Sequence, residues 1–230
     1  MVKRWINNAL SKLGYQLKST RGVGWHPDNL RNIGCPRTVV DVGVGFGTPA
    51  LYKAFPDAFH VMVEPLEEFE PYIRSILKNY SGEYIKTAVG AREEELQIHI
   101  EPNLPLKSSL QCRTELTATG DLPKTRRISV TTLDTLLEKH VFEPPFGLKI
   151  DTEGFEYQVI EGASDFLRTT QFVIAEVSVS PRFEDGYTFA GFVALMDQNH
   201  LALYDILQVQ KPRQSRVLFV DAVFTNESLR

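Results

Sequence analysis

The chain has few of the features that mark secreted, membrane-spanning or metal-binding proteins. Its 230 residues include only two cysteines, Cys35 and Cys112, far apart and without His or Cys neighbours at metal-ligand spacing. We therefore expect reduced thiols and a cytoplasmic protein. No run of 18 apolar residues is present to predict a transmembrane helix. Basic residues interrupt the N-terminal stretch where a secretory signal needs an apolar core.

Acidic residues are absent from the first 27 positions, whereas five basic residues occur there. Apolar residues recur at helical spacing through residues 2–17, which predicts a basic amphipathic helix. Such a helix suits peripheral membrane or dimer contact through residues 1–18, and equally packing on its own domain. We expect residues 1–37 to form this helix and a connecting segment, and residues 38–230 to form the main domain. The net charge of −4 argues against nucleic acid as a partner.

Predicted strands and helices alternate through most of the main domain. The strands are residues 38–42, 58–63, 84–88, 96–100, 128–132, 146–150, 172–177, 201–209 and 216–224, and the helices are 49–55, 66–79, 133–140, 157–167 and 189–198. This alternation predicts an α/β fold with a doubly wound, mostly parallel sheet. The last two strands have only a short turn between them, so they must form an antiparallel hairpin. The polar segment 101–127 is predicted to be a loop, either a functional one or an ordinary exposed one.

A glycine-rich turn follows the first predicted strand. Asp41, Gly43, Gly45 and Gly47 stand in the order Asp-x-Gly-x-Gly-x-Gly. Such a turn lets the backbone approach a nucleotide-like ligand and presents the next helix N-terminus to it. The dinucleotide fingerprint needs a third glycine where this chain has Thr48. An NAD-dependent oxidoreductase is therefore a disfavoured alternative, and a non-catalytic interaction module is a second alternative.

An acidic residue, Glu64, ends the second predicted strand, about 20 residues beyond the glycine turn. A carboxylate at this place offers paired acceptors to the two hydroxyls of a ribose. Pro65 after it, and Ala88 and Val89 at the third strand end, are expected to flank an adenine. NAD would use the same acidic residue, so Glu64 alone does not separate the cofactors.

The most distinctive motif is Leu148-Lys-Ile-Asp-Thr-Glu-Gly-Phe-Glu156, preceded by Val130-Thr-Thr-Leu-Asp134 and followed by Glu161-Gly162. Together with the glycine turn it resembles the FkbM-type family of S-adenosylmethionine-dependent methyltransferases, over residues 38–177. The resemblance implies the Rossmann-like class I methyltransferase fold, with seven strands and a C-terminal antiparallel hairpin. It also implies methyl transfer from S-adenosylmethionine to a hydroxyl of a saccharide or related natural product, hence a small-molecule or glycan acceptor. The segment 101–127 is then the predicted loop that recognises this acceptor. The expected cofactor-binding residues are Asp41, Gly43, Gly45, Gly47, Glu64, Pro65, Ala88 and Val89.

Two departures from the family pattern accompany this resemblance. Thr48-Pro49 and Tyr52 make an unusual start to the first helix, and Ser178 stands where a histidine is expected. The second departure leaves the identity of any general base open.

Three acids, Asp151, Glu153 and Glu176, are predicted at strand ends on the edge where open α/β sheets bind ligands. One could serve as the general base for a hydroxyl, or the three together could hold a Mg²⁺ ion. Alternatively, Asp151 and Glu153 accept hydrogen bonds from backbone amides at the following helix N-terminus. We expect Glu156 to serve that helix. His26 is a rival base if its segment folds over the site.

Overall fold

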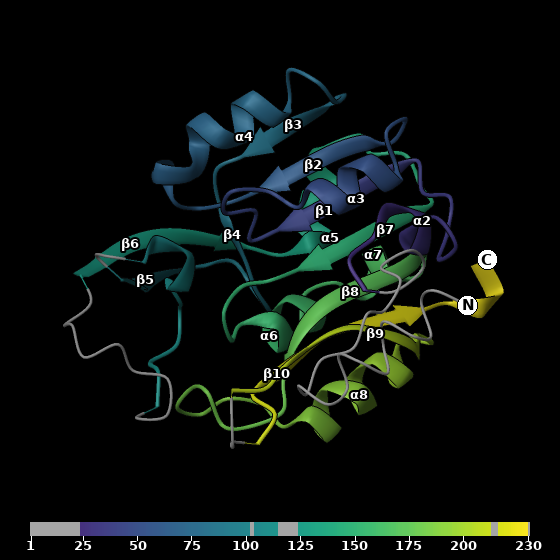
Figure 1. The fold of residues 1–230 in the computed structure, drawn as a ribbon. Helices are drawn as coiled ribbons and strands as arrows, with labels where there is room; N and C mark the ends of the chain where they lie inside the picture. The colour runs from purple at the N-terminus through teal and green to yellow at the C-terminus, as the bar shows by residue number, and fades with distance from the viewer. Residues whose placement is uncertain (1–23, 102–103, 115–123, 213–215, 230) are drawn as a thin grey trace, which may run out of the picture.

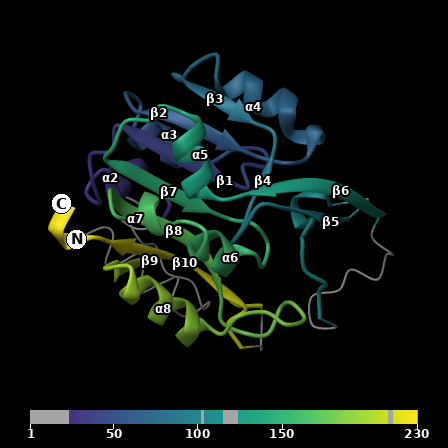
Figure 2. The same cartoon turned by 180° about the vertical axis from the view of Figure 1, so that it is seen from behind.

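The computed structural model describes residues 24–101, 104–114, 124–212 and 216–229 (Figures 1 and 2). The predicted amphipathic helix, with its membrane or dimer contact, lies outside the described residues, as does part of the predicted acceptor loop. Among the helices described, none has the length and apolar character needed to cross a bilayer.

The main sheet has seven strands in the order β3-β2-β1-β7-β8-β10-β9. The first five run parallel, and β10 pairs antiparallel with both β8 and β9. The predicted mostly parallel sheet with a C-terminal antiparallel hairpin is confirmed. The strands are β1 Thr38–Val42, β2 Phe59–Val63, β3 Gly82–Ile85, β7 Phe146–Ile150, β8 Thr170–Ser178, β9 Ala202–Gln210 and β10 Phe219–Thr225.

Helices cover both faces of this sheet, as Figures 1 and 2 show from opposite sides. One apolar core packs α5 Leu133–Lys139, α6 Glu156–Glu161, α7 Ser164–Leu167 and α8 Phe189–Gln198 against it. The other core packs α2 Pro27–Leu30, α3 Pro49–Ala54 and α4 Glu70–Ile76. Side chains of a strand alternate between the faces, so Val39 meets α3 while Val40 meets α5. The fold is therefore doubly wound.

A second, three-stranded sheet stands at the carboxyl ends of the parallel strands (Figure 1). It contains β4 Ala88–Val89, β6 Lys124–Thr131 and β5 Glu94–Ile100, in that spatial order. Two predictions were wrong here. The predicted third strand, 84–88, is divided between β3 in the main sheet and β4 in the small one, and the predicted loop 101–127 ends in strand β6.

The predicted helix 157–167 is also wrong in one respect, because it breaks into α6 and α7. Gly162 sits so close to Gly90 that a Cβ atom there would lie 2.1 Å from the Gly90 carbonyl oxygen. The Asp134 carboxylate then accepts hydrogen bonds from the amides of Asp165 and Phe166 and starts a new helix. The break thus follows from a crossing of distant segments that helical periodicity does not reveal.

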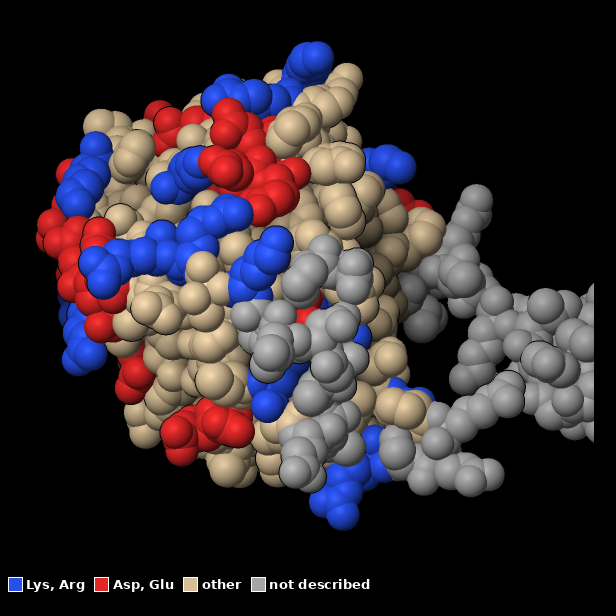
Figure 3. All heavy atoms as spheres, turned by 90° about the vertical axis from the view of Figure 1, so that its left-hand side faces the viewer, with Lys and Arg blue, Asp and Glu red and all other residues tan. Residues whose placement is uncertain are grey.

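The face in Figure 3 carries positive and negative side chains interspersed rather than a continuous basic stripe. Among the exposed ion pairs of the protein, Arg126 lies 2.6 Å from Glu68 and Lys86 lies 3.0 Å from Glu67. Such pairs are screened by solvent and contribute little to stability. The absence of a nucleic-acid partner stays a prediction.

Candidate functional site

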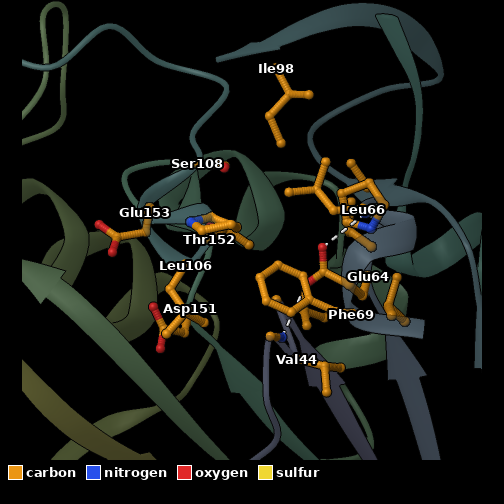
Figure 4. A pocket seen from close by; sticks show the side chains of 18 of the residues that line it. Val44, Glu64, Leu66, Phe69, Ile98, Leu106, Ser108, Asp151, Thr152 and Glu153 are labelled. Carbon is orange, nitrogen blue, oxygen red and sulfur yellow. Dashed lines mark hydrogen bonds between the residues drawn. The ribbon is translucent and has the colours of Figure 1, made fainter. Parts of the chain in front are cut away.

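A cavity of about 230 Å³ opens at the carboxyl ends of β1, β2 and β7 (Figure 4). The glycine turn forms one wall, and the small sheet with the segment 104–110 forms another. Of the residues predicted to bind a cofactor, those on the cavity surface are Gly43, Gly45, Gly47, Glu64, Pro65, Ala88 and Val89. Asp41 is the exception.

The glycine turn needs its glycines for two separate reasons. Gly43, Gly45 and Gly47 have φ values of +74°, +53° and +98°, in the left-handed region that side chains disfavour. In addition, a Cβ atom on Gly43 would lie 1.9 Å from the carbonyl oxygen of Asp151. The turn therefore passes directly against the end of β7, which brings Asp151 to the cavity.

Glu64 is fixed inside the cavity by two backbone amides. Its Oε2 accepts a hydrogen bond from Gly45 N at 3.1 Å, and its Oε1 accepts one from Leu66 N at 3.0 Å (Figure 4). Burial raises the pKa of Glu64 to about 7, although the two amides oppose the shift. Each carboxylate oxygen has further acceptor capacity, so the side chain is held ready for donors from a ligand.

Asp41 lies beneath the glycine turn rather than on the cavity surface, which corrects its predicted direct contact with a cofactor. Its carboxylate accepts a hydrogen bond from the Tyr52 hydroxyl at 2.6 Å and lies 3.1 Å from Lys149 Nζ. The physical reason is strand alternation: Asp41 points to the same side as Val39, toward α3.

Tyr52 also explains the unusual start of α3. Its hydroxyl accepts a hydrogen bond from Thr48 N at 2.9 Å while donating to Asp41. Pro49, at the first position of the helix, has no N–H to satisfy. The first departure from the family pattern, Thr48-Pro49 with Tyr52, thus forms one connected arrangement that holds the turn onto α3.

Lys149 is a residue of the candidate site that sequence reasoning missed. It lies on β7 directly opposite Asp41 on β1, and only 5% of its surface is exposed. Its ammonium donates to the Gly43 carbonyl at 2.9 Å and lies 3.8 Å from Asp151 Oδ2. Burial lowers the pKa of Lys149, but the carboxylates of Asp41 and Asp151 outweigh it and the pKa is raised. The available signal was a single lysine in an otherwise apolar strand, because buried charges require partners.

The three predicted catalytic acids do not converge on a common point. Arg182 stands between two of them, with its guanidinium 2.6 Å from Glu153 and 2.5 Å from Glu176. Arg113 adds a second ion pair to Glu153 at 3.0 Å. Across the described part of the chain, no group of three His, Cys, Asp or Glu side chains is arranged to hold a metal. The predicted Mg²⁺ site is therefore not supported, because arginines already pair with Glu153 and Glu176 and the three acids do not converge.

Asp151 differs from the other two acids. Its side chain is 42% exposed, and its nearest cationic group is Lys149. In Figure 4 its carboxylate points away from Glu64, toward the far side of the cavity. Asp151 also lines a neighbouring cavity, which Glu176 reaches as well but Glu153 does not.

The remaining predicted residues have mainly structural contacts. Glu156 accepts hydrogen bonds from the amides of Thr152 and Gly154, each at 3.0 Å, and so fixes the turn that follows β7. His26 lines neither of the two cavities and accepts from Asp28 N at the start of α2. Ser178, at the expected histidine position, also lies outside both cavities.

Part of the predicted acceptor loop forms the outer wall of the cavity. Leu106 covers Gly45, where an added Cβ would lie 2.6 Å from its Cδ2. Ser109 donates a hydrogen bond to the Glu153 carbonyl at 2.5 Å, and Arg113 binds the carboxylate of the same residue. Ser109 and Arg113 therefore anchor this segment to the end of β7.

The contact between Tyr52 and the glycine turn generates a stability prediction. Tyr52→Phe removes the donor to the buried Asp41 carboxylate and the acceptor of Thr48 N. We expect a loss of about 1–3 kcal/mol in the free energy of unfolding, measured by urea denaturation. Tyr72→Phe is the control, because Tyr72 is 50% exposed. Equal losses for the two variants would contradict the arrangement.

The raised pKa of Glu64 generates a pH prediction. A carboxyl group with a pKa of about 7 when folded and 4.5 when unfolded stabilises the fold fully below pH 4.5. This contribution is lost as the pH rises through about 7. The free energy of unfolding of Glu64→Gln, relative to that of the wild type, should therefore increase by on the order of 2–3 kcal/mol between about pH 4.5 and 8. Urea unfolding at each pH measures the gain; parallel pH profiles for the two proteins would contradict it. Glu67→Gln, at a side chain 63% exposed, is the control.

Comparison with known proteins identifies the family. The model of the methyltransferase FkbM domain matches residues 41–208, more than half of the chain. No curated protein matches the chain. Among solved structures, methyltransferase FkbM from Methylobacillus flagellatus is similar at 13% identity and a TM-score of 0.49, over 82% of this chain and 43% of that chain. This chain thus spans less than half of that relative.

Two other solved structures are also similar to the chain. The 1,6-didemethyltoxoflavin-N1-methyltransferase of Burkholderia thailandensis is 11% identical, with a TM-score of 0.45 over 84% of this chain and 72% of its own. Fibrillarin of Aeropyrum pernix, in complex with S-adenosyl-L-methionine, is 12% identical, with a TM-score of 0.45 over 83% and 67%. The order of the seven strands and the domain match confirm the predicted Rossmann-like class I methyltransferase fold. The chain belongs to the FkbM methyltransferase family.

Proposed function

We propose that the protein is an S-adenosylmethionine-dependent O-methyltransferase that acts on a hydroxyl of a saccharide or related natural product. The observation that carries this proposal is Glu64, a buried carboxylate fixed by Gly45 and Leu66 and turned toward a cavity beside a glycine turn. The family of the chain supports methyl transfer. The oxygen acceptor and its chemical class are our own inference.

The cavity residues fit the parts of this cofactor. The free acceptor capacity of Glu64 suits a ribose diol, because each hydroxyl donates one hydrogen bond. Leu66, Ala88 and Val89 are buried apolar residues on the same cavity and suit the faces of an adenine. Gly43 and Gly45 line the same cavity in a left-handed conformation that side chains disfavour. The acidic side chain of Asp151 lies across the cavity, where a positively charged group is favoured.

When bound, S-adenosylmethionine supplies a methyl group on a positively charged sulfur, and its transfer to a hydroxyl leaves S-adenosylhomocysteine, a methyl ether and one proton. The chain must accept that proton and position the oxygen. Asp151 is our assigned base, because its carboxylate lies on both cavities and, among the described residues, its ion-pair partner is Lys149 at 3.8 Å. Glu153 and Glu176, tied to Arg182, shape the wall instead.

Cofactor binding is tested by calorimetric titration of the full chain with S-adenosylhomocysteine. The wild type should bind, and Glu64→Ala should weaken binding by about tenfold to a hundredfold, as expected for lost hydrogen bonds to a charged group. Glu67→Ala, an exposed neighbour, is the matched control and should bind as the wild type does. A folded wild-type protein that binds NADH but not S-adenosylhomocysteine would overturn the proposal.

The role of Asp151 is tested by turnover. Asp151→Asn should lower the transfer rate by about 10²–10⁴-fold, the usual contribution of a general base. Its affinity for S-adenosylhomocysteine should stay within a few-fold of the wild type. Mass spectrometry of the gain of one methyl on hydroxylated acceptors measures the rate. A variant with an unchanged rate would remove Asp151 from the mechanism.

A further inference from the structure

A second cavity, of about 320 Å³, adjoins the first across the end of the glycine turn. It lies over the carboxyl ends of β7 and β8 and beside β9 and β10. The two cavities share Gly47, Thr48, Lys149 and Asp151. A molecule in the second cavity therefore adjoins the contents of the first along these residues, which include the Asp151 carboxylate.

One wall of the second cavity is built from residues distant in sequence. Trp25 donates from its indole Nε1 to Asp221 Oδ2 at 2.5 Å. Gln208 stands opposite Asp221 on the neighbouring strand β9, and all three residues line the cavity. An aromatic ring beside carboxylate and amide groups suits a ligand with an apolar ring face and hydroxyl groups at its edges.

The charges around this cavity are mostly negative. Asp151, Glu176 and Asp221 line it, and Lys149 is the lining residue of opposite sign. Lys149 is already held by Asp41 and by the Gly43 carbonyl. Burial raises the pKa of Asp221 to about 6, and the charge of Asp151 adds to this shift. Glu176 is already paired with Arg182. An anionic ligand would therefore meet chiefly the carboxylates of Asp151 and Asp221, so the cavity disfavours it.

We propose that the second cavity is the acceptor site, and that it takes a polyhydroxylated ring without negative charge, lodged against Trp25, Asp221 and Gln208. The inference rests on the proposed function. It adds the position at which the acceptor binds, and it predicts that the acceptor carries no negative charge. Asp221 and Asp151 together set this selection.

The test is saturation-transfer NMR on the full chain loaded with S-adenosylhomocysteine, with three probes: methyl α-D-glucopyranoside, glucosamine and glucuronate. The neutral and amine-bearing probes should receive saturation, and glucuronate should receive none. Trp25→Ala and Gln208→Ala should each weaken binding of the neutral probe by about tenfold. Gln210→Ala, also exposed but outside the cavity lining, is the control. In Asp221→Asn, the difference in saturation between the neutral probe and glucuronate should become smaller.

Calorimetry on the same samples separates this inference from the proposed function. If S-adenosylhomocysteine does not bind, the proposed function fails. If it binds in every variant but the neutral probe does not bind, the inference is overturned. It is also overturned if glucuronate binds as well as the neutral probe, or if Trp25→Ala and Gln208→Ala both leave probe binding unchanged.

Discussion

The ion pair between Asp41 and Lys149 is the contact on which the site depends. Both residues lie in wholly buried and mostly apolar strands, and they stand opposite each other on adjacent strands. Removal of one partner from such a pair costs about 3–5 kcal/mol, because the other charge stays buried. The same lysine holds the Gly43 carbonyl and approaches Asp151. This one buried ion pair therefore connects the glycine turn, strand β7 and Asp151, the assigned base.

The acidic residues around this ion pair have three different roles. Glu64 faces the first cavity and has a raised pKa, so its ionised form costs free energy that a ligand with hydrogen-bond donors can offset. Glu153 and Glu176 are joined by Arg182 into the wall between β7 and β8. Asp151 alone among the predicted catalytic acids reaches both cavities. Environment, rather than residue type, separates these roles.

The sequence predicted those features that are local. Strands 38–42 and 146–150 were predicted with correct bounds because they are short apolar runs next to clear turn signals. Glu64 and the glycines were placed at the cavity by their position at strand ends. The break at Gly162, the division of 84–88 and the burial of Asp41 were missed, since each depends on a contact between distant segments. Lys149 was overlooked for the same reason: its partner lies on another strand.

The sequence could not show that the predicted Mg²⁺ ligands Glu153 and Glu176 are paired with arginines, because these arginines lie in loops without a recognisable motif. The boundary at residues 37 and 38, and the role of residues 1–18, stay predictions.

The most direct measurement is a crystal structure of the protein with S-adenosylhomocysteine. The account predicts both ribose hydroxyls within hydrogen-bond distance of Glu64, and the sulfur on the side of Asp151. A ligand that leaves Glu64 without contact, or that lies outside the cavity, would contradict it.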